Sequence, residues 1–295
     1  MFFEAIDGHR DLLGEGPFWD QETGTLWTAD ILNCLIRARR PGGEEHVYEL
    51  PDVVSAAIPR ASGGLLLTMR DGAYLFETQT GELTPFAKPD TDPGNRSNES
   101  RTDPEGRLWL GTMQYKPLVK GRSEPLDSSS GTMSMVRADG TFETKITGVG
   151  ITNTLCWSAA GDWLVTADSL ANVMWKYPFN QATGELGERT IFSQIEGHGV
   201  PDGSAIDNED HIWNARFGAG CIIRFKPSGE IERIVDVPVK QPTSCVFGRA
   251  DMQDLFVTSA RIYLSAADLE ANPLEGATLA ARAPVSGQAC VRFAG

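Results

Sequence analysis

Six polar residues recur at one position relative to a repeated turn in this sequence, and their types could bind a cation. Each lies five residues before the first residue of its turn: Glu15, Ser55, Asn98, Asn153, Asp202 and Thr243. Glu15, Asn153 and Asp202 supply two negative charges and only oxygen donors, which hard divalent cations prefer. The same side chains could instead cap turns and bond backbone amides. The spacing predicts a candidate metal site but leaves this structural alternative open.

The turns belong to a repeated strand–turn–strand unit. Each unit combines a polar turn, usually with glycine, and a short strand rich in Leu, Trp and Val. The six segments are residues 20–30, 60–69, 103–113, 158–168, 207–217 and 248–259. A repeat of roughly 40–50 residues fits four strands per unit.

The repeat predicts an all-β fold, a six-bladed β-propeller in which residues 1–295 form one domain. Equivalent positions of the blades would then form a ring of side chains around one mouth of a central tunnel. A pair of β-sandwiches is the structural alternative. Residues 114–130 are polar and interrupt one blade as an inserted surface loop, which could be a lid or a harmless insertion. Residues 265–270 are expected to form a short turn or helix.

Composition excludes several classes of protein. The net charge of -14 would repel nucleic acid and anionic membranes. No apolar run approaches the ~20 residues that span a bilayer, and the N-terminus lacks the features of a signal peptide, so we expect a cytoplasmic protein. The five cysteines are scattered without a CxxC pair, which argues against disulfides and thiolate zinc sites. A Gly-x-Ser-x-Gly nucleophile elbow is absent from the sequence.

Five motifs in order along the chain resemble the SMP-30/gluconolactonase/LRE-like family, the regucalcin and sugar-lactonase group. They are LGEGPFW (13–19), NRSN (95–98), DPEGRLWLGTM (103–113), ITN (151–153) and PDG (201–203). The resemblance covers nearly the whole chain. It implies a six-bladed propeller that hydrolyses aldonolactones, so the expected partner is a small-molecule sugar lactone.

The resemblance also implies roles for individual residues. One divalent cation would be held at the tunnel mouth by Glu15, Asn153 and Asp202. Ca²⁺ is the first expectation, with Mg²⁺, Mn²⁺, Zn²⁺ or Fe²⁺ as alternatives. Arg96 and Asn98 would contact the sugar.

The sequence departs from the family pattern near these residues. Glu99-Ser100 stands where Asn98 is usually followed by Asp-Gly, and Thr154 replaces the usual glycine after Asn153. Some relatives carry an acidic residue after the GTM motif, where this chain has Gln114-Tyr115-Lys116. Cys156 replaces a commoner aspartate. These changes leave the metal set intact and bear on the identity of the substrate.

Lactone hydrolysis requires a polarised carbonyl, a deprotonated water and a stabilised oxyanion, and a cation can supply much of this. Asp202 is the candidate catalytic base, with Glu99 as second candidate. Arg96 would orient the substrate and favour developing negative charge. The positive charges of Lys116, Arg96 and the cation could locally offset the repulsion between the acidic protein surface and an anionic aldonate product. Two alternatives remain: a non-enzymatic calcium-binding propeller, and a six-bladed esterase or phosphotriesterase with a second cation.

Overall fold

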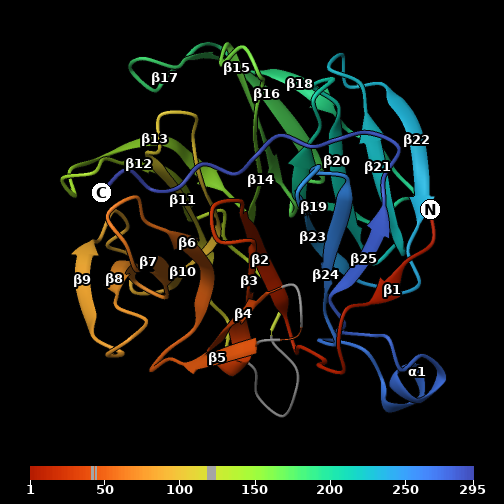
Figure 1. The fold of residues 1–295 in the computed structure, drawn as a ribbon. Coiled ribbons are helices and arrows are strands. Elements are labelled where there is room, and N and C mark those ends of the chain that lie inside the picture. Colours follow the sequence, from red (N-terminus) through yellow and green to blue (C-terminus); the bar gives the residue numbers. More distant parts are fainter. Residues whose placement is uncertain (41–42, 44, 118–123) are drawn as a thin grey trace.

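Six antiparallel sheets are arranged radially around a central axis in the computed structural model (Figure 1). The structure describes residues 1–40, 43, 45–117 and 124–295. The prediction of a six-bladed β-propeller is confirmed, and each repeated turn of the sequence joins the first and second strands of a blade. The inserted segment at 114–130 separates two strands of blade 3, and its residues 118–123 lie outside the described part of the chain.

The strands of each blade follow one another in the sequence, except in blade 6. Blade 1 contains β2 (Gly14–Asp20), β3 (Thr25–Asp30), β4 (Leu35–Arg39) and β5 (Glu45–Glu49). Blade 2 contains β6 (Val54–Pro59), β7 (Leu65–Met69), β8 (Gly72–Phe76) and β9 (Leu83–Ala87). Blade 3 contains β10 (Asn95–Thr102), β11 (Leu108–Gln114), β12 (Gly131–Val136) and β13 (Phe142–Val149). Blade 4 contains β14 (Thr152–Trp157), β15 (Trp163–Asp168), β16 (Val173–Asn180), β17 (Glu185–Leu186) and β18 (Thr190–Ser193). Blade 5 contains β19 (Val200–Ile206), β20 (Ile212–Phe217), β21 (Cys221–Phe225) and β22 (Ile231–Asp236).

Blade 6 joins the two ends of the chain. It contains β23 (Pro242–Gly248), β24 (Asp254–Ser259), β25 (Leu279–Arg282) and the N-terminal strand β1 (Glu4–Ala5). β1 pairs with β25, Glu4 lying opposite Ala280. The ring is thereby closed by hydrogen bonds between residues far apart in the sequence, which leaves only short outer sheet edges.

An aspartate side chain fixes the repeated turn in blade 3. Asp103 Oδ1 accepts hydrogen bonds from the backbone N–H groups of Glu105 and Arg107. Its Oδ2 accepts a hydrogen bond from Trp109 Nε1 at 3.0 Å. The Trp109 ring is fully buried and packs edge to face against Trp157 of blade 4. The Asp–Trp spacing of the repeat therefore connects a turn to the hydrophobic core between two blades.

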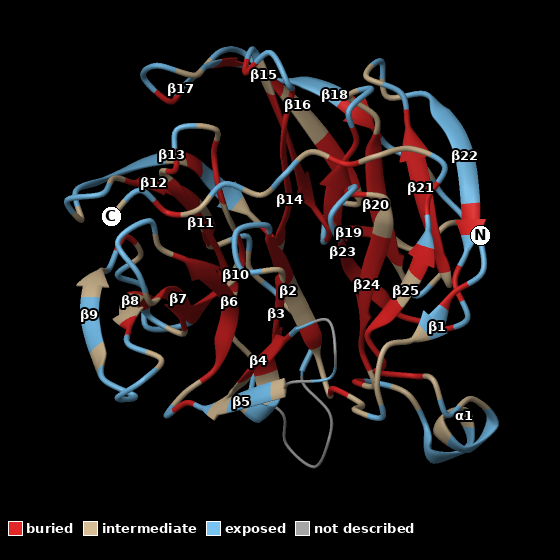
Figure 2. Ribbon diagram, in the orientation of Figure 1, coloured by how far each residue is buried: buried red, intermediate tan, exposed pale blue. Residues whose placement is uncertain are grey.

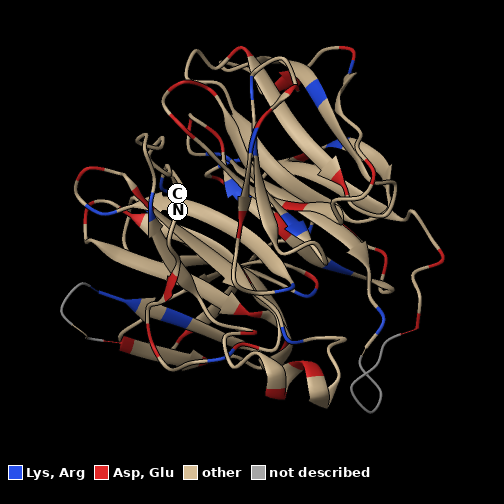
Figure 3. Cartoon of the chain, turned by 90° about the vertical axis from the view of Figure 1, so that its right-hand side faces the viewer, with Lys and Arg blue, Asp and Glu red and all other residues tan. Residues whose placement is uncertain are grey.

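The hydrophobic core lies between neighbouring blades rather than in one central cluster. The inner strands are buried, whereas outer strands such as β9 and β22 are largely exposed (Figure 2). Acidic positions are spread over the loops of several blades, with basic positions between them (Figure 3). All five cysteines are free thiols, as predicted.

A short helix and a C-terminal tail lie outside the blades. Helix α1 (Ala266–Ala271) begins with a capping box between Ser265 and Asp268, so the predicted helical segment is confirmed. Within the described ranges, no helix is long and apolar enough to cross a membrane.

The C-terminal tail (residues 286–295) crosses the end of the tunnel at which the inner strands finish (Figure 1). The backbone N–H of Asn208 in blade 5 donates to Ser286 O at 2.9 Å, and the Phe293 N–H donates to Pro59 O of blade 2 at 2.9 Å. Between these points, Thr102 of blade 3 donates a hydrogen bond to the tail. The tail therefore connects three blades on this face.

Candidate active site

All six residues of the repeated position lie on the innermost strand of their blade, where its pairing with the second strand is interrupted. The register shifts at or beside Glu15, Ser55, Asn98, Asn153, Asp202 and Thr243. A β-bulge re-aims a side chain in this way. Ser55 and Thr243 form hydrogen bonds to the neighbouring blades: Ser55 Oγ donates to Ser97 Oγ, and Thr243 Oγ1 donates to Gly14 O. The other four line one cavity.

This cavity has a volume of about 180 Å³ and lies at the end of the tunnel where the inner strands begin. The predicted site residues in its wall are Glu15, Arg96, Asn98, Lys116, Asn153 and Asp202. The rest of the wall is largely apolar and includes Leu13, Met113, Ile151 and Phe217. A larger hollow of about 500 Å³ beside blade 2 contains none of the predicted residues. The fold thus brings together side chains from blades 1, 3, 4 and 5.

The three predicted metal ligands differ in how much of their hydrogen-bonding capacity is used. Glu15 Oε2 accepts a hydrogen bond from Gly16 N at 3.1 Å, and Asp202 Oδ1 accepts one from Gly203 N at 3.1 Å. Asn153 Nδ2 donates to Ser169 Oγ at 2.8 Å, which leaves its oxygen for another partner. Each ligand therefore retains acceptor oxygen that a cation could use.

The two carboxylates repel each other in a site of low polarity. Burial and the nearby charge of Glu99 raise the pKa of Glu15 to about 8. Burial, followed by the charges of Glu15 and Glu99, raises the pKa of Asp202 well above its usual value. Among the described residues, neither carboxylate has a lysine or arginine nitrogen within 4.0 Å. Buried carboxylates without a directly paired counter-charge are costly, and a divalent cation would relieve this repulsion. The donor set therefore fits such an ion.

Arg96 and Asn98 form a hydrogen-bonded chain beside these ligands. Arg96 Nη1 donates to Ser97 O at 2.7 Å and to Asn98 Oδ1 at 2.8 Å. Asn98 Nδ2 donates to Thr152 O at 2.8 Å and lies 3.4 Å from Asn153 Oδ1. A positive charge is thus fixed next to the candidate ligands, where it could attract negative charge on a substrate.

The chain matches a known family over most of its length. A family model described as the SMP-30/Gluconolactonase/LRE-like region matches residues 13–261. The chain belongs to this family. A 6-deoxy-6-sulfogluconolactonase from Pseudomonas putida is 31% identical over 289 residues, 96% of each chain. Pentonolactonase XacC from Haloferax volcanii is 30% identical over 249 residues, 84% of this chain and 81% of that protein. The crystal structure of a calcium-binding regucalcin from Agrobacterium tumefaciens has a TM-score of 0.90 and 33% identity, covering 98% of this chain and 96% of that one.

One departure from the family pattern occurs at a position with unusual backbone geometry. Thr154 has φ 54°, a left-handed conformation that favours glycine, the residue expected there from the SMP-30 family pattern. Its hydroxyl donates a hydrogen bond to Asp202 O at 2.6 Å and lies 2.8 Å from Ser204 Oγ. These contacts between blades 4 and 5 help to offset the cost of the conformation.

Glu99 is buried and does not line the cavity. Burial raises its pKa, and the charge of Arg101 opposes this effect. Arg101 lines a second chamber of about 160 Å³ at the opposite end of the tunnel. Glu99 therefore lies between the two ends, and its role as a second catalytic base stays a prediction.

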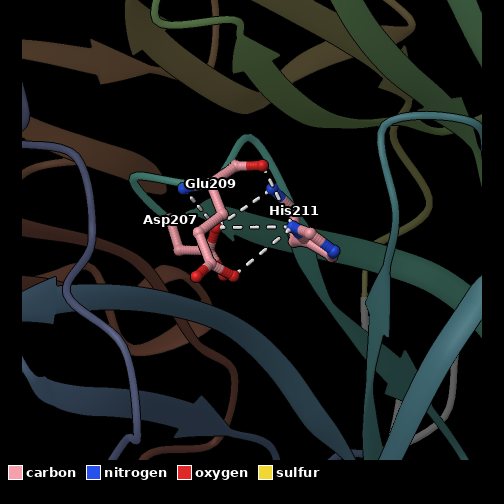
Figure 4. Close-up of side chains that lie close together, drawn as sticks. All are labelled: Asp207, Glu209 and His211. Carbon is pink, nitrogen blue, oxygen red and sulfur yellow. Dashed lines mark hydrogen bonds and ion pairs between the residues drawn. The ribbon is translucent and has the colours of Figure 1, made fainter.

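A separate group, Asp207, Glu209 and His211, has ligand atoms within 4.8 Å of one another (Figure 4). Asp207 is fully buried, and its Oδ1 accepts hydrogen bonds from the N–H groups of Glu209 and His211. Its Oδ2 accepts from Trp213 Nε1 at 2.8 Å and Arg224 Nε at 2.9 Å. Because these four donors already satisfy the carboxylate, the group stabilises the blade 5 turn, as Asp103 does in blade 3.

Several residues of the cavity were not predicted. Ser169 follows β15 and donates a hydrogen bond to Pro201 O, while its Oγ accepts from Asn153. Tyr263, which follows β24, lines the cavity from blade 6. Both lie in connections between strands, outside the repeated position, so no spacing in the sequence marks them. A positive φ of 66° at Tyr263 has no sequence signal either.

Proposed function

We propose that this protein hydrolyses a sugar lactone to the corresponding aldonic acid, using one divalent cation bound by Glu15, Asn153 and Asp202. The pair of repelling carboxylates on the wall of a small cavity that also contains Arg96 carries the proposal. The names of the Pseudomonas and Haloferax relatives support lactone hydrolysis as the reaction class. Ca²⁺ is the expected ion, because all three ligands are oxygen donors and the Agrobacterium relative is described as calcium-binding.

The bound cation would supply Lewis acidity at the lactone carbonyl and at the attacking water. The Asp202 carboxylate accepts a proton from this water as the water oxygen attacks the carbonyl carbon. Arg96, held by Asn98, donates hydrogen bonds to oxygens that gain negative charge. Breakage of the ring C–O bond then gives a hydroxyl, which takes the proton from Asp202, and the free carboxylic acid.

A cation-binding protein without catalysis is the second candidate, supported by the description of the Agrobacterium relative. The two functions differ in turnover. Pentono- and hexonolactones and an aryl ester should be assayed by acid release, with and without chelator, after correction for spontaneous ring opening. Chelator-sensitive turnover of a lactone supports the proposal, whereas turnover of the aryl ester alone indicates an esterase.

The substitution Asp202→Asn tests the role of the carboxylate. It should lower kcat by about 10²–10⁴-fold, the range that a general base contributes. Asp236→Asn is a matched control, because Asp236 is exposed on β22 of the same blade. Full lactonase activity of the Asp202→Asn variant with excess divalent cation would contradict the proposed mechanism.

A further inference from the structure

Three side chains at the rim of the cavity form a small polar cluster. Gln114 Nε2 donates a hydrogen bond to Asp127 Oδ1 at 2.6 Å, and the backbone N–H of Asp127 donates to Gln114 Oε1 at 3.0 Å. Lys116 Nζ donates to Asp127 Oδ2 at 3.3 Å. Gln114 ends β11, and both it and Lys116 line the cavity. Two donors of the cavity wall therefore hold a carboxylate that belongs to another segment of the chain.

This carboxylate is weakly held and replaceable. The side chain of Asp127 is 70% exposed, and an exposed ion pair contributes only ~0–1 kcal/mol to stability. Hydrogen bonds from Gln114 and Lys116 nonetheless lower the pKa of Asp127, so these donors favour a negative charge at this point. Another anion with two acceptor oxygens could take its place at little cost.

The charge balance of the cavity favours a negatively charged substrate. A divalent cation would cancel the charges of Glu15 and Asp202. Arg96 has no carboxylate oxygen within 4.0 Å among the described residues. Lys116 forms an ion pair with the exposed Asp127, at 3.3 Å. With the cation in place, the wall therefore carries an excess of positive charge.

We propose that Gln114 and Lys116 bind an anionic substituent of the substrate lactone, and that Asp127 occupies this subsite when no substrate is bound. The inference rests on the proposed lactonase function. The subsite belongs to blade 3, whereas the candidate cation ligands belong to blades 1, 4 and 5. The anionic group, a carboxylate, sulfonate or phosphate, would therefore lie away from the ring carbonyl. The amide and ammonium groups at this wall attract such a group, whereas an acidic side chain in their place would repel it.

The test compares neutral and anionic substrates that share one ring. Glucono-1,5-lactone is the neutral probe, and its counterparts with a carboxylate, sulfonate or phosphate at C6 are the anionic probes. We expect Lys116→Met to lower the ratio of kcat/KM for anionic over neutral lactone by about 10-fold, through loss of one charge-assisted hydrogen bond. Asp127→Asn should raise the ratio by about 3-fold, because a competing anion is removed. The preferred probe among the three identifies the anionic group.

Lys226→Met is the matched control, because Lys226 pairs with Glu230 at 3.1 Å in the turn after β21, at the opposite end of blade 5. It should leave the ratio unchanged. Equal losses for neutral and anionic lactones in Lys116→Met, or an unchanged ratio in both rim variants, would overturn the inference while leaving lactonase activity established. If the wild-type protein hydrolyses none of the lactones, the proposed function itself fails, and the subsite with it.

Discussion

Substitution of Glu15 offers a sharp test of the candidate cation site. The Glu15 carboxylate should destabilise the folded protein without cation and stabilise it when a cation is bound. Its pKa in the folded protein is about 8, against a usual value of 4.5. Below the lower value the carboxyl is protonated in both states. As pH rises, the unfolded chain loses the proton first, so the free energy of unfolding of the cation-free protein falls until the folded pKa is reached.

The magnitude follows from the size of the pKa difference. Each pH unit between the two pKa values lowers the free energy of unfolding by about 1.4 kcal/mol. Ionisation of Glu15 in the unfolded chain therefore lowers stability by up to ~3 kcal/mol at about pH 7. This value is an upper limit, because the Glu15 side chain is partly open to the cavity. Glu15→Gln should remove this contribution and stabilise the cation-free protein. In this variant Asp202, whose pKa is also raised, still contributes a slope of the same sign.

Urea unfolding in chelator, at several pH values between about 5 and 8, measures this slope. With Ca²⁺ at about 100 times its dissociation constant, the free energy of unfolding of the wild-type protein should rise by ~2.7 kcal/mol. That of Glu15→Gln should rise much less, so the stability advantage of the variant in chelator should shrink or reverse. Glu188→Gln, at an exposed position, is the control. A flat pH profile for chelated wild-type protein, or a Glu15→Gln variant less stable than wild type in chelator, would refute the reasoning.

Three further predictions concern other parts of the molecule. Asp207→Asn should lower the free energy of unfolding by about 1–3 kcal/mol, since Trp213 and Arg224 lose a charged acceptor while Arg224 keeps its ion pairs with two glutamates, but should not change the stoichiometry of one cation measured by calorimetry. Gly203→Ala would place its Cβ 2.1 Å from Ser244 Oγ, so we expect a cost of ~1–3 kcal/mol and reduced lactonase activity through displacement of Asp202; unaltered kinetics would contradict this. Deletion of residues 1–6 removes β1 and should lower the thermal midpoint and promote association through the β25 edge, which light scattering would detect.

The fold was predictable because it repeats. Each repeated turn predicted one blade independently of the others. The polar residue five positions earlier, such as Asp202, marked the bulge of the inner strand. The periodic position therefore located Glu15, Asn98 and Asn153 on one cavity without any contact information. Assignment of roles to them remained dependent on the family resemblance.

Features without a period were not predictable. The strand β1 has two residues, too few for an alternating pattern, and its pairing with β25 depends on closure of the whole ring. Ser169 and Asp127 bond to residues at the site from connections between strands, where the sequence has no repeated spacing. Glu99 follows Asn98 at the bulge and is absent from the cavity wall, and its role as a second catalytic base stays a prediction.

The C-terminal tail bears on how substrate and product would reach and leave the cavity. It runs across the face opposite the cavity, and residues 288–291 form part of the wall of the chamber there, so the tail partly covers that face. For the proposed reaction, we expect lactone to enter and acid to leave by the opening on the cavity side. A lingering aldonate would then exclude the next lactone, so inhibition by the reaction product should be competitive.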